Sequence, residues 1–212
     1  MDWRRFLIDF GHLPVIEAEI LLAGVSAPAA NKVQVSRWRK QGNLIRLRRG
    51  IYILAPAFRK TEPNEFHIAS LLNRPSYVSL EKALEFHGLI PEGVPVYTSV
   101  TAKRPERLNT PLGVFDYRHV KSPLFWGYET LTVNGQTAHI ASPEKALLDY
   151  FYLKGSDASP ERLDGLRLQN LKKVDARKLA AFAKRFAVPG IERAARALQL
   201  LLPTRSGGEK RK

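Results

Sequence analysis

Two groups of side chains in this 212-residue sequence could do chemistry: acids and histidines in its middle part, and basic residues nearer its N-terminus. Asp116, His119 and Glu129 are the set that could serve a metal-dependent nuclease. However, the acid-x-Lys partner of common nucleases is missing at Glu129, where the sequence reads Glu-Thr-Leu. The sequence also lacks a P-loop, a G-x-S-x-G motif and an H-E-x-x-H motif. We therefore expect no catalytic site, metal or cofactor, and a nuclease is the less favoured alternative.

The basic group is centred on the stretch from Val35 to Leu54, which reads VSRWRKQGNLIRLRRGIYIL. Val35 and Trp38 have the spacing that places two side chains on one face of a helix. Gly42 stands where this helix would stop, because glycine adopts the left-handed backbone conformation without strain. Apolar residues then alternate on both sides of Arg48-Arg49-Gly50, which is typical of a two-stranded hairpin with a glycine-containing turn. The stretch thus predicts a helix followed by a basic hairpin.

The charge of this segment is one-sided, because no acid occurs between Glu19 and Glu62. A helix followed by a basic hairpin is the outline of a winged helix-turn-helix, in which the hairpin is the wing. We expect Arg37 and Gln34 to discriminate bases, and the hairpin arginines to contact the DNA backbone or minor groove. The predicted DNA-binding residues are Lys32, Gln34, Ser36, Arg37, Arg39, Lys40, Arg46, Arg48 and Arg49.

The remaining periodicity predicts an α+β protein made of an N-terminal winged helix-turn-helix and a C-terminal mixed domain with an antiparallel sheet and flanking helices. The start of the recognition helix is ambiguous, and we favour residues 32–41 capped by Asn31 over a longer helix capped by Ser26. The predicted domains are residues 1–57 and 63–202, followed by a disordered basic tail, 203–212. Further helices are predicted at 2–10, 14–23, 64–74, 80–87, 143–153, 174–186 and 189–202, and strands at 77–79, 94–100, 112–120, 131–133 and 137–140.

The net charge of +14 is concentrated in two parts of the sequence. Residues 1–62 hold 11 basic and 5 acidic side chains, residues 63–154 hold 9 of each, and residues 155–212 hold 14 and 6. Clustered positive charge creates the local potential that attracts phosphates, so nucleic acid is the expected partner. A possible second basic surface comprises Lys172, Lys173, Arg177, Lys178, Lys184 and Arg185.

Three segments give the chain a resemblance to the AbiEi family, the antitoxin and repressor components of bacterial AbiE-type (type IV) toxin–antitoxin systems. The pattern R-L-x-R-G-x-Y occurs at 46–52, and P-E-K-A-L-L-D occurs at 143–149. The pattern Y-x-S-x-x-x-A-L-x-x-H-G-L is met by Tyr77, Ser79, Ala83, Leu84, His87, Gly88 and Leu89. The chain departs from many relatives in that Ala27-Pro28-Ala29-Ala30 follows Gly24-Val25-Ser26 before the recognition helix.

This resemblance implies that the winged helix binds operator DNA, expected to contain inverted repeats, and represses the family's own operon. It also implies that the C-terminal domain neutralises a nucleotidyltransferase-like toxin of the AbiEii type. Toxin binding, toxin modification and action on the toxin's target all stay open. The alternative is a solitary regulator whose C-terminal domain senses a ligand or dimerises. The second basic surface could contact DNA, dock to an acidic toxin surface, or be a solvated helix face.

Two further features concern where the protein resides. The sequence contains no apolar run near the length of a membrane span, and residues 1–10 lack the apolar core of a signal peptide. There is no cysteine, so no disulfide and no Cys-ligated zinc can form. We expect a cytoplasmic protein without a membrane partner.

Overall fold

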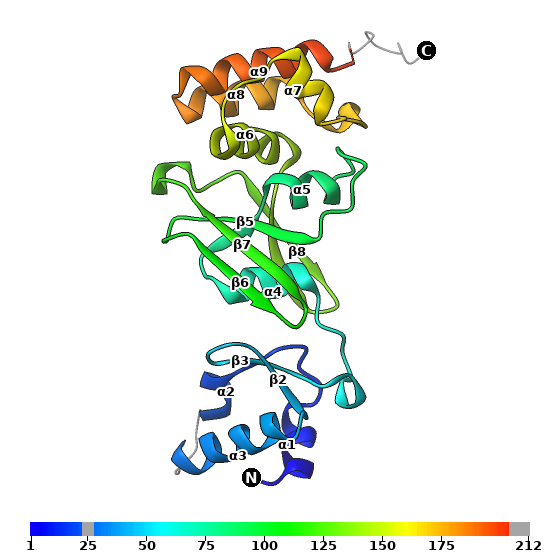
Figure 1. Cartoon of the computed structure of the whole chain (residues 1–212), viewed down its shortest axis with the longest axis vertical. Helices are drawn as coiled ribbons and strands as arrows, with labels where there is room; N and C mark the ends of the chain where they lie inside the picture. The colour runs from blue at the N-terminus through cyan, green and yellow to red at the C-terminus, as the bar shows by residue number, and fades with distance from the viewer. Residues whose placement is uncertain (23–27, 204–212) are drawn as a thin grey trace, which may run out of the picture.

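The structure, a computed structural model, describes residues 1–22 and 28–203 (Figure 1). A three-stranded sheet and the first three helices lie at one end, a six-stranded sheet lies in the middle, and the last four helices lie at the other end. The predicted α+β class is confirmed. The predicted tail lies outside the described residues except for Pro203.

The N-terminal part combines three helices with a small antiparallel sheet of order β1-β3-β2. Asp2 accepts a hydrogen bond of 2.8 Å from the backbone of Arg5, so the first helix starts and ends as predicted. The elements are α1 (Trp3–Phe10), β1 (Ile16–Glu17), α2 (Ala18–Leu22), α3 (Pro28–Lys40), β2 (Leu44–Arg48) and β3 (Ile51–Leu54).

Two predicted helix starts are wrong. The helix expected from Pro14 begins only at Ala18, because Ile16 and Glu17 pair with β3 instead. Helix α3 begins at Pro28 rather than at Lys32. A proline fits this first helical position, since its missing N–H would have no partner inside the helix. The expected helix end at Ala23 and the alternative cap Ser26 lie outside the described residues.

The β2–β3 hairpin is buried on both of its faces. Leu44 and Leu54 belong to the N-terminal core together with Phe6, Ile16 and Trp38. Leu47, Ile51 and Ile53 point to the other face and belong to the large core of the rest of the chain. The hairpin is therefore an intermediate layer between its own helices and the six-stranded sheet region (Figure 1).

A connector with a short 3-10 helix, η1 (Pro56–Phe58), leads into the second part. Asn64 caps the next helix as predicted, because its side chain accepts hydrogen bonds from the backbone of Phe66 and His67. The elements that follow are α4 (Glu65–Leu72), β4 (Ser76–Val78), α5 (Leu80–Phe86), β5 (Val96–Thr101), β6 (Glu106–Thr110), β7 (Gly113–His119), η2 (Ser122–Leu124), β8 (Tyr128–Val133), β9 (Gln136–Ala141), α6 (Pro143–Lys154), α7 (Pro160–Gly165), η3 (Leu171–Lys173), α8 (Ala176–Phe186) and α9 (Pro189–Leu201).

The six-stranded sheet has the order β6-β7-β5-β4-β9-β8 and is mixed. The predicted antiparallel sheet is wrong in this respect, because β5 pairs with β7 and β4 pairs with β9 in parallel. Strands β6 and β7 form a hairpin, and β7 rather than β6 lies beside β5. Strands β5 and β7 therefore run in the same direction. The predicted Asn134-Gly135 hairpin is confirmed, with φ of 50° and 73° at these residues.

A buried ion pair joins the sheet to helix α6. Lys145 and Asp149 have no exposed surface and form an ion pair one helical turn apart. The Tyr77 hydroxyl accepts a 2.9 Å hydrogen bond from Lys145 Nζ and donates one of 3.0 Å to Asp149, while the Ser79 hydroxyl donates one of 2.8 Å. Burial lowers the pKa of Lys145 and raises that of Asp149, each opposed by the partner's charge.

This network unites two of the segments that carry the family resemblance, Tyr77-x-Ser79 and Pro143–Asp149. Ser79 is the residue before helix α5 as predicted, but its side chain bonds to Asp149 instead of capping that helix. Lys145 Nζ also lies 4.7 Å from the ring centre of Phe186 in α8. Two distant motifs thus hold β4, α5, α6 and α8 together.

Replacing one member of the ion pair should destabilise the protein strongly. Asp149→Asn would leave Lys145 buried without its counter-charge, and we expect it to lower the free energy of unfolding by about 3–5 kcal/mol. Urea unfolding followed by circular dichroism measures this loss. Glu19→Gln, at an exposed carboxylate, is the control and should stay within about 0.5 kcal/mol. A loss below about 1 kcal/mol for Asp149→Asn would contradict the role of the pair.

Candidate nucleic-acid interface

The orientation of helix α3 is fixed by the buried side chain of Trp38. Trp38 is 5 % exposed, and its ring centre lies 4.6 Å from that of Phe6 and 5.1 Å from that of Trp3 in α1. Val35 is half-buried against the same cluster, as its spacing from Trp38 predicts. The opposite face of the helix therefore points away from the core.

The outer face of α3 carries a row of polar and basic residues. Lys32, Ser36 and Lys40 follow one another at intervals of four residues and are exposed, and Arg37 is exposed beside them. Arg39 is exposed at the flank of this row, whereas Gln34 lies closer to the core and is half-buried. The structure thus brings five of the predicted residues of α3 to its accessible surface and sets Gln34 apart from them.

The hairpin arginines fall into two kinds. Arg46 and Arg49 are exposed, and Arg49 stands at the turn next to Gly50, whose φ of 83° suits a glycine. Arg48 instead faces the six-stranded sheet region, where its guanidinium donates to the carbonyl of Leu72 and lies 3.0 Å from Glu106. Within the described residues, the ion pairs of the three arginines involve Arg48 alone.

A register shift in the hairpin explains the different position of Arg48. Arg46 pairs with Tyr52 and Arg48 pairs with Ile51, so one strand holds an extra residue between these two pairs. The bulge turns Arg48 toward the face that carries Leu47 and Ile51. Sequence alternation could not show this shift, although the unbroken apolar run of 51–54 is the signal of a strand that is buried on both faces.

A second ion pair ties the N-terminal sheet to the rest of the chain. Arg74, which follows α4, donates two hydrogen bonds of 3.0 and 3.2 Å to the carboxylate of Glu17 in β1. Arg48 on β2 and the Arg74 partner Glu17 on β1 thus fasten the two opposite edges of the same small sheet. Helix α3 lies on the far side of that sheet from the C-terminal part (Figure 1).

The predicted second basic surface does not form one uniform patch. Lys173 Nζ donates a 2.6 Å hydrogen bond to the carbonyl of His87, Lys178 Nζ lies 2.9 Å from Glu144, and the guanidinium of Arg185 lies 4.1 Å from the ring centre of Trp126. These three side chains serve internal contacts. The remaining three are exposed and could meet a partner: Lys172, Arg177 and Lys184.

The residues considered for a nuclease are not brought together. Asp116 in β7 and Glu129 in β8 are separated by the three strands between them, a distance of about 19 Å at the usual strand spacing. His119 Nδ1 lies 2.9 Å from the carbonyl of Lys103. No cluster of three acids or histidines suited to a metal ion occurs among the described residues.

Glu144 is a buried carboxylate that positions Lys178, and its contribution to stability should depend on pH. Burial alone would raise the pKa of Glu144, but hydrogen bonds from the backbone of Asp175, from Lys178 and from Ser142 hold the pKa below its ordinary 4.5. A carboxylate with a lowered pKa stabilises the folded state above its unfolded pKa and loses this contribution as the pH falls.

Glu144→Gln should therefore lower the free energy of unfolding at pH 7 by about 1–3 kcal/mol, because the amide removes a charged hydrogen-bond acceptor. The difference from the unmodified protein should shrink as the pH falls below 4.5 and through the lowered pKa. Urea unfolding at several pH values measures this trend, and Glu19→Gln at an exposed position is the control. A difference that grows on acidification would show that Glu144 does not act as a buried carboxylate.

Comparison with known proteins finds a similarity over the basic segment. A family described as "Transcriptional regulator, AbiEi antitoxin" matches residues 18–55, which include α2, α3 and the β2–β3 hairpin. No match was found among curated proteins. No helix within residues 1–22 and 28–203 has the length and apolar character needed to cross a membrane. The match over residues 18–55 confirms the resemblance of this chain to the AbiEi antitoxins, a family of transcriptional regulators.

Proposed function

We propose that this protein is a DNA-binding antitoxin that represses its own toxin–antitoxin operon. In this proposal residues 1–57 act as a winged helix-turn-helix, with α3 as the recognition helix and the β2–β3 hairpin as the wing. The family match supports the regulatory role because it covers the segment that holds both elements. The C-terminal part neutralises a nucleotidyltransferase-like toxin of the AbiEii type.

The observation that carries the DNA-binding proposal is the outer face of α3. Lys32, Arg37 and Lys40 are exposed there, and no ion pair within the described residues occupies them. Cations without acidic neighbours are free to replace the counterions of a phosphate backbone. The rigid packing of Trp38 against Phe6 holds this face at a fixed angle to the hairpin.

The exposure of each side chain suggests its role. Arg37 is exposed and could reach a guanine edge with two hydrogen bonds, whereas the half-buried Gln34 is less accessible than the sequence suggested. Lys32, Lys40 and the turn residue Arg49 are suited to phosphates. Arg48 is not part of the proposed contact surface, because its guanidinium is engaged with Leu72 and Glu106.

Phosphate contacts should be visible in the salt dependence of binding. Lys40→Ala or Arg49→Ala should each reduce the slope of log Kd against log salt by about 0.9, because each removes one counterion-releasing contact. Fluorescence anisotropy with a duplex from the region upstream of the gene gives this slope. Arg48→Ala is the matched control from the same hairpin and should leave the slope unchanged. An equal loss of slope for Arg48→Ala would place that side chain on the DNA.

Base recognition should be visible in sequence preference rather than in salt dependence. Arg37→Ala should reduce affinity for the operator by about 1–3 kcal/mol, or roughly 5- to 150-fold, and change affinity for a shuffled duplex much less. Competition between the two duplexes measures the ratio. If Arg37→Ala weakens both duplexes equally, Arg37 is a phosphate contact and another residue reads the bases.

The antitoxin role requires a partner and separates this proposal from a solitary regulator. The exposed residues Lys172, Arg177 and Lys184 in the C-terminal part give a toxin with an acidic surface a place to bind. Co-expression with the product of the adjacent gene tests for such a partner. Rescue of growth from that product supports an antitoxin, whereas DNA binding without rescue supports a solitary regulator.

A further inference from the structure

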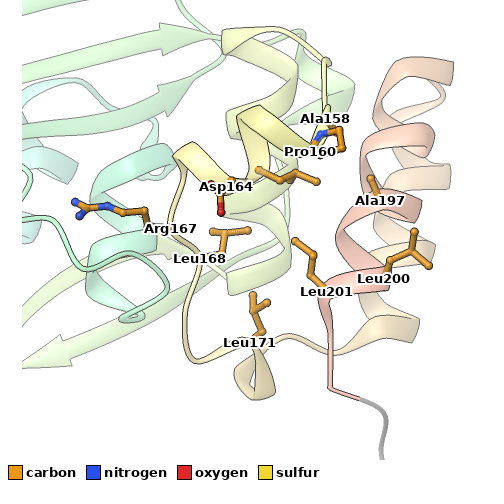
Figure 2. Close-up of a pocket in the computed structure, with 10 residues that line it drawn as sticks. Ala158, Pro160, Asp164, Arg167, Leu168, Leu171, Ala197, Leu200 and Leu201 are labelled. Carbon is orange, nitrogen blue, oxygen red and sulfur yellow. The ribbon is translucent and has the colours of Figure 1, made fainter.

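An apolar groove lies at the end of the molecule opposite to α3, between α7 and α9. Its volume is about 480 Å³. Figure 2 shows Leu168 and Leu171 of the α7–η3 segment facing Leu201 of α9 across the groove, while Leu200 projects outward from α9 and Arg167 points away from the groove. Arg167 forms an ion pair with Glu92. The apolar lining side chains are Leu163, Leu168, Leu171, Ala197, Leu200 and Leu201.

The groove is accompanied by an apolar side chain that has no cover. Leu200 is 87 % exposed, and its neighbour Leu201 is 45 % exposed. A single exposed leucine is ordinary, but an exposed leucine at the rim of an apolar groove places an apolar projection next to an apolar depression. Residues 204–212, Thr-Arg-Ser-Gly-Gly-Glu-Lys-Arg-Lys, carry no large apolar side chain that could fill it.

The charges around the groove are arranged in two opposite walls. Helix α7 presents the exposed acids Glu161 and Asp164. Helix α9 presents the exposed bases Arg193 and Arg196, one turn before Ala197 and Leu200 on the same face. Arg196 lies 3.9 Å from Glu192 of its own helix, a loose contact that leaves it available.

We infer that this groove is an interface between two copies of the chain, related by a two-fold axis. Such an interface uses one patch on both copies, and the patch must be complementary to itself. Here Leu200 of each copy enters the groove of the other. The basic face of α9 in each copy lies against the acidic wall of α7 in the other, so the same contact forms on both sides of the axis. Both copies then present their α3 helices at the far ends of the dimer.

The charge pattern favours a second copy over a uniformly acidic partner. An acidic partner would be attracted to Arg193 and Arg196 but repelled by Glu161 and Asp164. A second copy satisfies both walls at once. The patch is small compared with the roughly 800 Å² per partner of a standard interface, so the dimer should form at micromolar rather than nanomolar concentrations.

Sedimentation velocity of the full chain between about 1 and 100 µM tests the inference without any use of DNA. The unmodified protein should dimerise in this range. Leu200→Glu should raise the dimer dissociation constant at least tenfold, because it would place a charge in an apolar groove. Val133→Glu is the control, since Val133 is 53 % exposed on the distant β8–β9 hairpin and should leave the equilibrium unchanged.

Exchanging the charges of Arg196 and Asp164 tests whether the dimer forms through this groove rather than through another surface. Arg196→Glu should weaken the dimer, and combining it with Asp164→Arg should restore it, because the two side chains meet across the two-fold axis. A protein that stays monomeric at 100 µM, or a dimer that is unaffected by Leu200→Glu, would overturn the inference. A monomer whose binding to the adjacent gene product is lost in Leu200→Glu would assign the groove to that partner and would also overturn it. None of these three outcomes bears on operator binding.

Discussion

The burial of the β2–β3 hairpin on both faces is the constraint on which the arrangement of this protein depends. One face packs on Trp38 and the helices of the N-terminal part, and the other packs into the core of the C-terminal part. A hairpin in such a position cannot swing freely. Its side chains are divided among two cores and the exposed turn. Arg46 and Arg49 are therefore exposed, whereas Arg48 is engaged with Leu72 and Glu106.

A second constraint fixes the C-terminal part on which the hairpin rests. The Lys145–Asp149 pair is completely buried, and each charge is tolerated because hydroxyl groups from β4 and from the start of α5 complete its hydrogen bonds. These hydroxyls belong to a segment about seventy residues earlier in the sequence. The two motifs recognised along the chain are therefore two halves of one structural network, while the family match itself covers residues 18–55.

The sequence predicted local features well because their causes are local. Asp2, Asn64 and Ser142 cap helices through their own side chains, and Asn134-Gly135 makes a hairpin turn. It did not predict features that depend on distant neighbours. Strand β6 was missed because Glu106–Thr110 contains a single apolar residue, and the parallel pairings depend on which strand lies beside which. Nothing in the local sequence of Arg48 reveals its contacts with Glu106 and Leu72.

The proposed repressor function requires sequence-specific DNA binding by the outer face of α3. The most direct measurement is a comparison of two labelled duplexes of equal length and composition at about 0.15 M salt, one from the region upstream of the gene and one with the same bases shuffled. A sequence-specific repressor should bind the upstream duplex at least about 10³-fold more tightly than the shuffled one. Equal affinity for the two duplexes would show that the basic surface binds DNA only through its charge, and would contradict the repressor assignment.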